Sequence, residues 1–195
     1  MKKKKIKLAI FVSGSGTNCE NIIRYFEKNE DIEVALVVSN KSDAYALVRA
    51  QKLGVPTLTV TKEVLNNPEF TLQLSSIYKI DLIILGGFLL KVPALMVKAY
   101  EHRMINLHPA LLPKYGGKGM YGHHVHEAVK ANHEKETGMT VHWVSNDVDG
   151  GDIIAQYRTP ISPNDTVEDI ANKEHELEMK YFPQEIERII SQLFK

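Results

Sequence analysis

The sequence of 195 residues has little cysteine, no net charge and no long hydrophobic run. Its single cysteine, Cys19, cannot form an intramolecular disulfide, and no Cys-x-x-Cys pair is present, so a reducing cytoplasmic location is expected. No apolar run approaches the ~18 residues that a membrane helix requires. The apolar stretch after the basic start is too short for a signal peptide. The sequence therefore predicts a protein with no membrane partner.

Two further classes of function are disfavoured by what is missing. Lys and Arg together number 24, as do Asp and Glu, so the positive excess typical of nucleic-acid-binding proteins is absent. The run Lys2–Lys5 is expected to be a solvated end of the chain. His123, His124 and His126 are not spaced to share one helix face, and no His-Glu-x-x-His motif or cysteine partner accompanies them. We therefore expect neither a nucleic-acid partner nor a bound metal.

Apolar runs alternate with stretches of helical periodicity over much of the chain. Strands are expected over 5–13, 33–40, 55–60, 81–87 and 103–108, and helices over 17–29, 43–54, 70–79, 93–100 and 123–133. Strands that are separated by helices usually pair in parallel. The later strands, 138–145 and 152–160, are joined only by NDVDGG and are expected to form a hairpin.

The expected fold is an α/β fold with a Rossmann-like open twisted sheet. The sheet is predicted to be mostly parallel, with an antiparallel C-terminal hairpin and helices on both faces. No linker, repeat or low-complexity segment interrupts residues 1–195, so a single domain is predicted. The last helical stretch, 166–194, contains Pro183, which is expected to break or kink it.

The loop Ser13–Asn18, with the sequence SGSGTN, follows the first expected strand. Gly14 and Gly16 allow tight turns and the close approach of a ligand. The helix start that follows offers unpaired N–H groups and the positive end of the helix dipole. Because ligands bind beyond the carboxyl ends of strands in open α/β sheets, the loop is predicted to hold a simple phosphate ester. The alternative is a plain strand-to-helix turn.

More specific nucleotide motifs are absent from this loop. The dinucleotide fingerprint requires Gly where the chain has Cys19, and Asn40 rather than an acid ends the second expected strand. No GxxxxGK[ST] motif is present either. Cys19 is most simply a small packing residue, although its position near the helix start favours a lowered thiol pKa.

The stretch RMINLHPALLP carries two polar side chains on an apolar strand that must end at Pro109. Asn106 and His108 are two residues apart, so both side chains point to the same face of the strand. An amide and an imidazole are hydrogen-bond donors that suit an oxyanion developing on a carbonyl. A structural role for both side chains at the strand end is the alternative.

The motif DVDGG offers a carboxylate that could complete this site. Asp149 precedes Gly150 and Gly151 on the loop between the hairpin strands, which can approach the same sheet edge. A carboxylate beside an imidazole raises its pKa and fixes its orientation. An ordinary Asp-Gly turn is the alternative, and Asp147 and Asp152 are competing carboxylates.

Taken together, these motifs resemble a known family. SGSGTN, LGGF, INLHPALLPKYGG and DVDGGDII occur in this order, and the chain is similar from its first strand to about Pro183 to the glycinamide ribonucleotide formyltransferases. The resemblance implies transfer of a formyl group from 10-formyltetrahydrofolate, as co-substrate, to the amine of glycinamide ribonucleotide in purine biosynthesis. It implies no metal and no covalent intermediate, and the chain is expected to act as a monomer or homodimer.

The resemblance also assigns roles to residues of this chain. The catalytic residues are expected to be Asn106, His108 and Asp149. The substrate phosphate is expected at Gly16, Thr17 and Asn18, and the glycinamide part at Glu174 on the last helix. The folate pocket is expected at Leu89, Leu90, Lys91 and Val92, with Asn106.

Two segments depart from the family pattern. Many members have Met-Arg-Ile-Leu where this chain has Leu89–Val92, so the positive charge moves by one position. The segment KYGGKGMYGHHVHEAV is longer than the common form, with His123 as the best match to an active-site histidine.

Two other functions are compatible with parts of the sequence. A formyltetrahydrofolate hydrolase would use the same cluster on water, although its relatives usually carry an added N-terminal domain. A non-catalytic α/β module that binds a phosphorylated metabolite would keep the first loop, but it would not need Asn106, His108 and Asp149 to converge.

Overall fold

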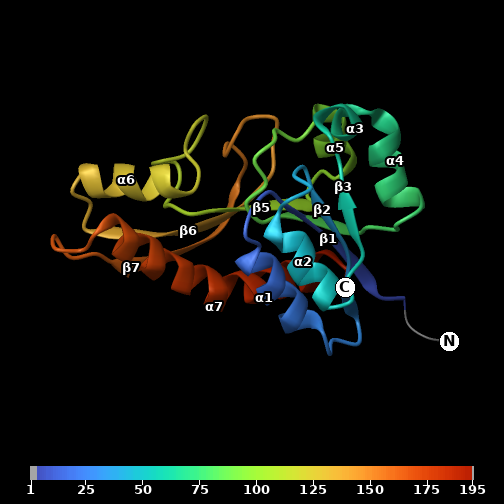
Figure 1. Cartoon of the computed structure of the whole chain (residues 1–195), viewed down its shortest axis with the longest axis horizontal. Helices are drawn as coiled ribbons and strands as arrows, with labels where there is room; N and C mark the ends of the chain where they lie inside the picture. Colours follow the sequence, from blue (N-terminus) through green and yellow to red (C-terminus); the bar gives the residue numbers. More distant parts are fainter. Residues whose placement is uncertain (1–3, 195) are drawn as a thin grey trace. The chain divides into compact units, whose positions relative to one another are not determined.

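The computed structural model describes residues 4–194, which form an alternation of strands and helices (Figure 1). In chain order the elements are β1 (Ile6–Val12), α1 (Thr17–Phe26), β2 (Ile32–Ser39), α2 (Tyr45–Lys52), β3 (Thr57–Thr59), α3 (Lys62–Asn66), α4 (Pro68–Ser76), β4 (Leu82–Leu85), α5 (Ala94–Ala99), β5 (Met104–His108), α6 (His123–Ala131), β6 (Glu136–Trp143), β7 (Ile153–Pro160) and α7 (Val167–Leu193). Each expected strand is present, and α3 is a short helix that the sequence pattern did not reveal.

The strands form a mixed seven-stranded sheet in the order β3-β2-β1-β4-β5-β6-β7. β1 pairs in parallel with both β2 and β4, and β2 pairs in parallel with β3. β6 and β7 pair antiparallel, which is the hairpin expected from the short link between them. The prediction of a mostly parallel α/β sheet with an antiparallel C-terminal end is confirmed.

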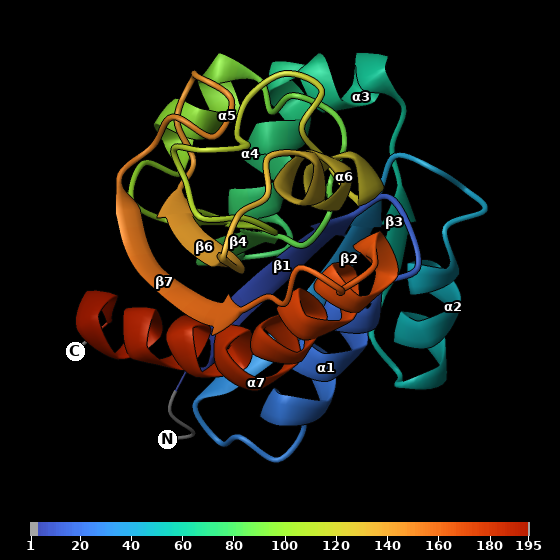
Figure 2. The ribbon, with the colours of Figure 1, turned by 90° about the vertical axis from the view of Figure 1, so that its left-hand side faces the viewer.

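The backbone contacts group the chain into a first unit up to Ile105 and a second unit from Asn106, so the boundary falls within β5. In the first unit, α1 and α2 lie on one face of the parallel strands, and α3, α4 and α5 lie on the other (Figure 2). Since both faces are covered, the central strands carry long apolar runs. Leu8–Val12 of β1 and Leu82–Leu85 of β4 are buried.

The second unit is built around the β6–β7 hairpin and the long helix α7. α7 packs along both strands and contacts α6, while Ala110, Val125, Val129 and Ile170 form a buried apolar cluster. A capping box between Thr166 and Asp169 starts the helix. Of the break or kink expected at Pro183, the break is wrong, since α7 continues through this residue to Leu193. Pro183 is buried together with Phe182 and Ile186 of the same helix, and packing of α7 against β6 and β7 offsets the hydrogen bond that proline removes.

Within the described residues, every helix is too short or too polar to cross a membrane.

Candidate functional site

The loop Ser13–Asn18 makes a tight turn that only glycine permits at position 16. Gly16 has φ 76°, which lies in the left-handed region. A Cβ atom at this position would lie 2.4 Å from Cβ of Ala46 in α2. The absence of a side chain therefore lets the loop lie directly against α2. α1 begins immediately afterwards at Thr17, so its first N–H groups adjoin the turn.

Ser13 joins the first loop to the ends of two neighbouring strands. Its hydroxyl donates to Oδ1 of Asn40, which follows β2, and accepts from the backbone N–H of Leu89 at 2.9 Å. Its own N–H donates to the carbonyl of Gly87 at 3.0 Å. These bonds hold the start of the predicted phosphate loop beside the predicted folate segment.

The predicted folate segment, Leu89–Val92, follows β4 and Phe88. The Phe88 ring packs edge-on against Phe11 of β1, with ring centroids 5.3 Å apart. Val92 is buried, whereas Leu89 is 49% exposed and Lys91 is also exposed. An exposed large apolar side chain beside a glycine-rich strand end is compatible with a ligand wall.

Cys19 is a packing residue. The side chain is fully buried, and burial raises its thiol pKa to about 12, with a further contribution from the charge of Glu20. The packing role expected for Cys19 is therefore confirmed, and the alternative of a lowered thiol pKa is wrong. Loss of hydration outweighs the attraction of the helix dipole for a thiolate.

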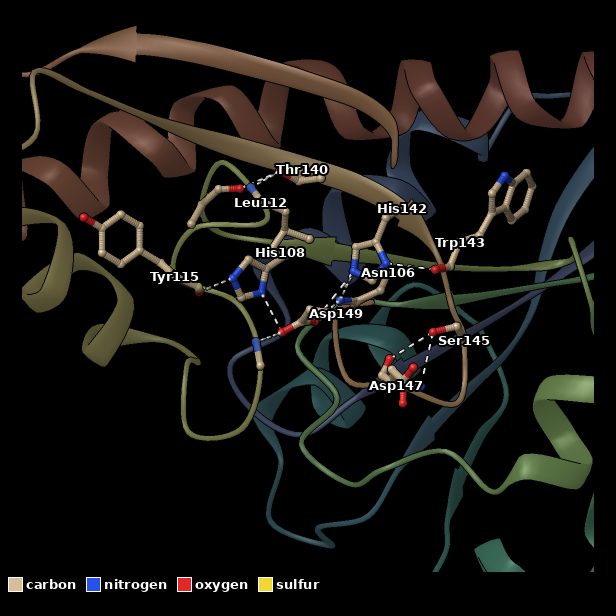
Figure 3. A network of polar contacts seen from close by, with 12 residues as sticks. Asn106, His108, Leu112, Tyr115, Thr140, His142, Trp143, Ser145, Asp147 and Asp149 are labelled. Atoms are coloured by element: carbon tan, nitrogen blue, oxygen red, sulfur yellow. Dashed lines mark hydrogen bonds and ion pairs between the residues drawn. The ribbon is translucent and has the colours of Figure 1, made fainter. Parts of the chain in front are cut away.

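The second unit brings Asn106, His108 and Asp149 together (Figure 3). Nδ2 of Asn106 lies 3.4 Å from Oδ1 of Asp149, and Nδ1 of His108 lies 3.5 Å from Oδ2 of the same carboxylate. His108 and Asp149 are almost entirely buried, so their charges are poorly screened by water. The convergence predicted from the strand spacing and the DVDGG motif is present.

His108 is held from both sides. Its Nε2 lies 2.7 Å from the carbonyl of Tyr115, which can only accept, so Nε2 carries a proton. Burial lowers the pKa of His108, and the charge of Asp149 and the Tyr115 carbonyl offset only part of that shift. The imidazole is therefore an acid that loses its extra proton more readily than an exposed histidine does.

Asp149 remains ionised despite its burial. Burial by itself raises the carboxyl pKa, but contacts with His142, a hydrogen bond from the N–H of Gly117 and the charge of His108 outweigh it, so the pKa lies below its usual value. The Gly117 bond is 2.9 Å long. Asp149 itself has φ 53°, and a Cβ atom on Gly151 would lie 1.8 Å from the carbonyl of Trp143. A tight turn thus presents the carboxylate to the cluster.

The competing carboxylates lie elsewhere. Asp147 is exposed. Its backbone N–H donates to the Ser145 hydroxyl, and its carbonyl accepts from that hydroxyl, so Asp147 stabilises the turn. Asp152 is also exposed, and its carbonyl accepts from the N–H of Trp143. The DVDGG segment therefore provides both expected features: Asp147 takes part in the turn, and Asp149 supplies the carboxylate of the cluster.

His142 is a member of the cluster that the sequence analysis missed. Its Nε2 lies 3.0 Å from Nδ2 of Asn106 and 3.6 Å from Oδ1 of Asp149. Its Nδ1 lies 2.9 Å from the carbonyl of Trp143, so Nδ1 donates there and Nε2 is left to face Asn106. His142 lies between Val141 and Trp143 on β6, and a histidine between apolar residues of a strand is the same kind of signal that singled out His108 on β5.

The last helix contributes buried acids. Glu174 is 2% exposed, and its Oε1 has no hydrogen-bond partner among residues 4–194. Burial, together with the charge of Glu178 and a hydrogen bond with it, raises the pKa of Glu174 well above its usual value. Glu178 is also buried, and its Oε2 lies 3.1 Å from Nδ1 of His175. The two carboxyl groups therefore form a pair, one helical turn apart.

The histidines of α6 differ in their surroundings. The side chain of His123, the best sequence match to an active-site histidine, is 58% exposed and lies 3.7 Å from a Glu127 oxygen. His126 is buried, and its Nδ1 has no hydrogen-bond partner in the described part of the chain. Burial lowers the pKa of His126, against the charge of Glu178. His126, rather than His123, therefore faces the interior of the second unit.

No group of three or more His, Cys, Asp or Glu residues within 4–194 is arranged to hold a metal ion.

Comparison with known proteins finds similarity along most of the chain. The formyl transferase family model matches residues 6–186. The phosphoribosylglycinamide formyltransferase of Haemophilus influenzae is 35% identical over 182 residues, which cover 91% of this chain and 84% of that protein. Its namesake in Bacillus subtilis is 32% identical over 189 residues, 94% of each chain. The crystal structure of the Anaplasma phagocytophilum protein of the same name aligns with a TM-score of 0.87 and 29% identity, over 98% of this chain and 90% of that one.

Proposed function

The chain belongs to the formyl transferase family, and we propose that it transfers the formyl group of 10-formyltetrahydrofolate to the amine of glycinamide ribonucleotide in de novo purine (IMP) biosynthesis. The observation that carries the chemical part of the proposal is the convergence of Asn106, His108 and Asp149 at the end of β5. A module that only bound a phosphorylated metabolite would have no use for this buried cluster.

The reaction is direct attack of the substrate amine on the formyl carbon. The attack places negative charge on the formyl oxygen, and Nδ2 of Asn106 and an N–H of His108 are the donors that receive it. The amine loses one proton, the tetrahedral intermediate collapses with cleavage of the bond between the formyl carbon and the folate nitrogen, and that nitrogen takes up a proton and leaves as a neutral amine. Asp149 offsets part of the effect of burial on His108, which favours its protonated form, and, directly or through water, relays the proton from the attacking amine toward the leaving folate nitrogen.

His108 must exchange one partner to act in this way. Its Nε2–H donates to the carbonyl of Tyr115, and its Nδ1 faces Asp149. Transfer of the Nε2–H bond from Tyr115 to the formyl oxygen keeps the Asp149 contact intact. The ring can then serve as a donor without losing the partner that fixes its orientation.

The substrates are anchored by residues that the family resemblance names and the local geometry supports. We place the phosphate at Gly16, Thr17 and Asn18, where a glycine turn adjoins the start of α1. Glu174 is assigned to the glycinamide part, since a buried carboxyl oxygen with no protein partner can accept from an amine.

The folate is assigned to Leu89, Leu90, Lys91 and Val92, with Asn106. The exposed Leu89 side chain supplies apolar contact, and Lys91 can approach the acidic tail. The chemistry needs no metal, because the donors and the carboxylate come from the protein. A cytoplasmic location, and a monomer or homodimer with no nucleic-acid or membrane partner, remain predictions of the sequence.

One assay separates the proposal from its rivals. Loss of 10-formyltetrahydrofolate is followed spectroscopically, with and without glycinamide ribonucleotide. Loss that depends on the amine, with a formylated ribonucleotide product, is the expected result. Loss without the amine would instead identify a formyltetrahydrofolate hydrolase, and no loss in either arm would favour a binding module.

A further inference from the structure

Two successive carbonyl groups of the first loop are held by α2. The backbone N–H of Ala46 donates to the carbonyl of Gly14 at 3.2 Å. Nε of Arg49, one turn further along α2, donates to the carbonyl of Ser15 at 2.9 Å. The peptide groups Gly14–Ser15 and Ser15–Gly16 are therefore both oriented by one face of the same helix.

This orientation decides where the N–H groups of the loop point. A trans peptide group is planar, with its C=O and N–H directed oppositely. Because the carbonyls of Gly14 and Ser15 point toward α2, the N–H groups of Ser15 and Gly16 point away from it. Neither N–H has an acceptor among the residues that the structure describes. Two adjacent free donors beside a helix start form a concave seat for an anion.

Arg49 is itself fixed in place. Its NH1 group forms an ion pair with Glu20 of α1, and its guanidinium lies 4.9 Å from the centroid of the Tyr45 ring. Arg24 binds the same carboxylate at 2.8 Å. Hydrogen bonds from Arg49 and Arg24 lower the pKa of Glu20, so this carboxylate is charged at neutral pH. With its other end held in this way, the Arg49 side chain keeps its bond to the loop.

We infer that Arg49 is a positioning residue for phosphate recognition. It turns the Ser15–Gly16 peptide so that the Gly16 N–H faces the ligand, and its charge on the Ser15 carbonyl polarises that peptide and strengthens the N–H as a donor. The inference deepens the proposed function, on which it rests for the nature of the substrate. Its effect is confined to the phosphate-bearing substrate and does not extend to the folate.

The kinetic test compares Arg49→Met with Arg24→Met. Both variants remove one positive charge beside Glu20, but only Arg49 bonds the loop carbonyl. For Arg49→Met we expect KM for glycinamide ribonucleotide to rise about 10-fold, as for loss of one charge-assisted hydrogen bond, while kcat and KM for the folate stay within about twofold. Arg24→Met is expected to leave all three within about twofold. Arg49→Lys, which keeps the charge and a donor, is expected to recover part of the loss.

A second measurement does not depend on formyl transfer. Inorganic phosphate is titrated into ¹⁵N-labelled protein, and the amide signals of Ser15 and Gly16 are followed by NMR. We expect saturable shifts at both signals in wild type and Arg24→Met, and about 10-fold weaker binding in Arg49→Met. Equal phosphate affinity in wild type and Arg49→Met, or no shift in wild type, would overturn the inference even if the enzyme transfers formyl groups. If phosphate binding followed the expected pattern in the three proteins but the wild type transferred no formyl group, only the proposed function would be overturned.

Discussion

At the scale of single residues, the orientation of the Asn106 amide decides whether the proposed oxyanion donor is available. Its amide nitrogen faces two groups, Nε2 of His142 at 3.0 Å and a carboxylate oxygen of Asp149 at 3.4 Å. A carboxylate can only accept, so the nitrogen rather than the oxygen of the amide must lie on that side. The side chain is thereby held in one orientation, as an oxyanion donor requires.

Asn106→Ala removes this donor without leaving a charge unpaired. We expect turnover to fall by about 10²-fold or more, with KM for glycinamide ribonucleotide little changed, since the donor acts on charge that develops during the reaction. Steady-state kinetics on the folded variant check this. Asn132→Ala, which changes an exposed amide at the end of α6, is the matched control and should behave as wild type. Normal turnover in Asn106→Ala would exclude the oxyanion role.

Asp149→Asn tests the electrostatic part of the cluster. The charge of Asp149 offsets part of the lowering that burial imposes on the pKa of His108, so its removal lowers this pKa further. The acid form of His108 is then lost at lower pH. We expect turnover to fall by roughly 10²–10⁴-fold and the alkaline fall of the pH–rate profile to move to lower pH. The control is Asp147→Asn, which changes an exposed carboxylate of the same loop. If the pH–rate profile changed in Asp147→Asn but not in Asp149→Asn, Asp147 rather than Asp149 would be the catalytic carboxylate.

At the scale of elements, the proposed phosphate loop and the catalytic cluster each depend on how one strand end is continued. β1 continues into a glycine turn held by α2, and β5 continues into Pro109, which ends the strand just after His108. The turn after β1 requires a left-handed conformation at Gly16 and a close approach to Ala46. Neither feature follows from the strand or the helix alone, because both depend on how the turn packs against α2.

Gly16→Ala and Gly14→Ala form a matched pair for this turn. A Cβ atom on Gly16 would collide with Ala46 and would occupy a left-handed conformation, whereas a Cβ atom on Gly14 would meet nothing within 4 Å. We expect Gly16→Ala to raise KM for glycinamide ribonucleotide by at least about 10-fold and to affect the folate less, with a smaller change for Gly14→Ala. Steady-state kinetics with each substrate varied in turn check this. Equal losses for both substrates in Gly16→Ala would argue against a phosphate seat.

At the scale of the whole molecule, buried acids couple folding to pH. Glu174 is 2% exposed, and burial with the neighbouring charge of Glu178 raises its pKa well above normal. The unfolded chain releases this proton near its ordinary pKa of about 4.3. Between that value and the raised folded pKa, the native state binds more protons than the unfolded state, so stability falls as pH rises.

Glu174→Gln should remove this contribution to the pH dependence. The amide has nearly the same shape but cannot ionise, so we expect the free energy of unfolding to decline less between pH 5 and pH 9 than it does in wild type. Urea unfolding at several pH values measures the difference. Glu176→Gln, an exposed acid on the same helix, is the control and should run parallel to wild type. A Glu174→Gln curve that is also parallel to wild type would show that Glu174 ionises normally in the folded protein.

The sequence by itself determined the order of strands and helices and the polar residues at strand ends. Periodicity two placed Asn106 and His108 on one face of β5, and the short NDVDGG link predicted the β6–β7 hairpin, because these are properties of neighbouring residues. The family motifs predicted a formyltransferase, in agreement with the family match over residues 6–186.

The tertiary structure decided which distant residues meet and what burial does to them. It selected Asp149 over Asp147, added His142 to the cluster, and raised rather than lowered the pKa of Cys19. α7 also continues through Pro183 because of packing against the hairpin. Local pattern fixes which atoms a segment can present, but distance, desolvation and packing depend on elements far apart in the chain, so only the folded molecule determines them.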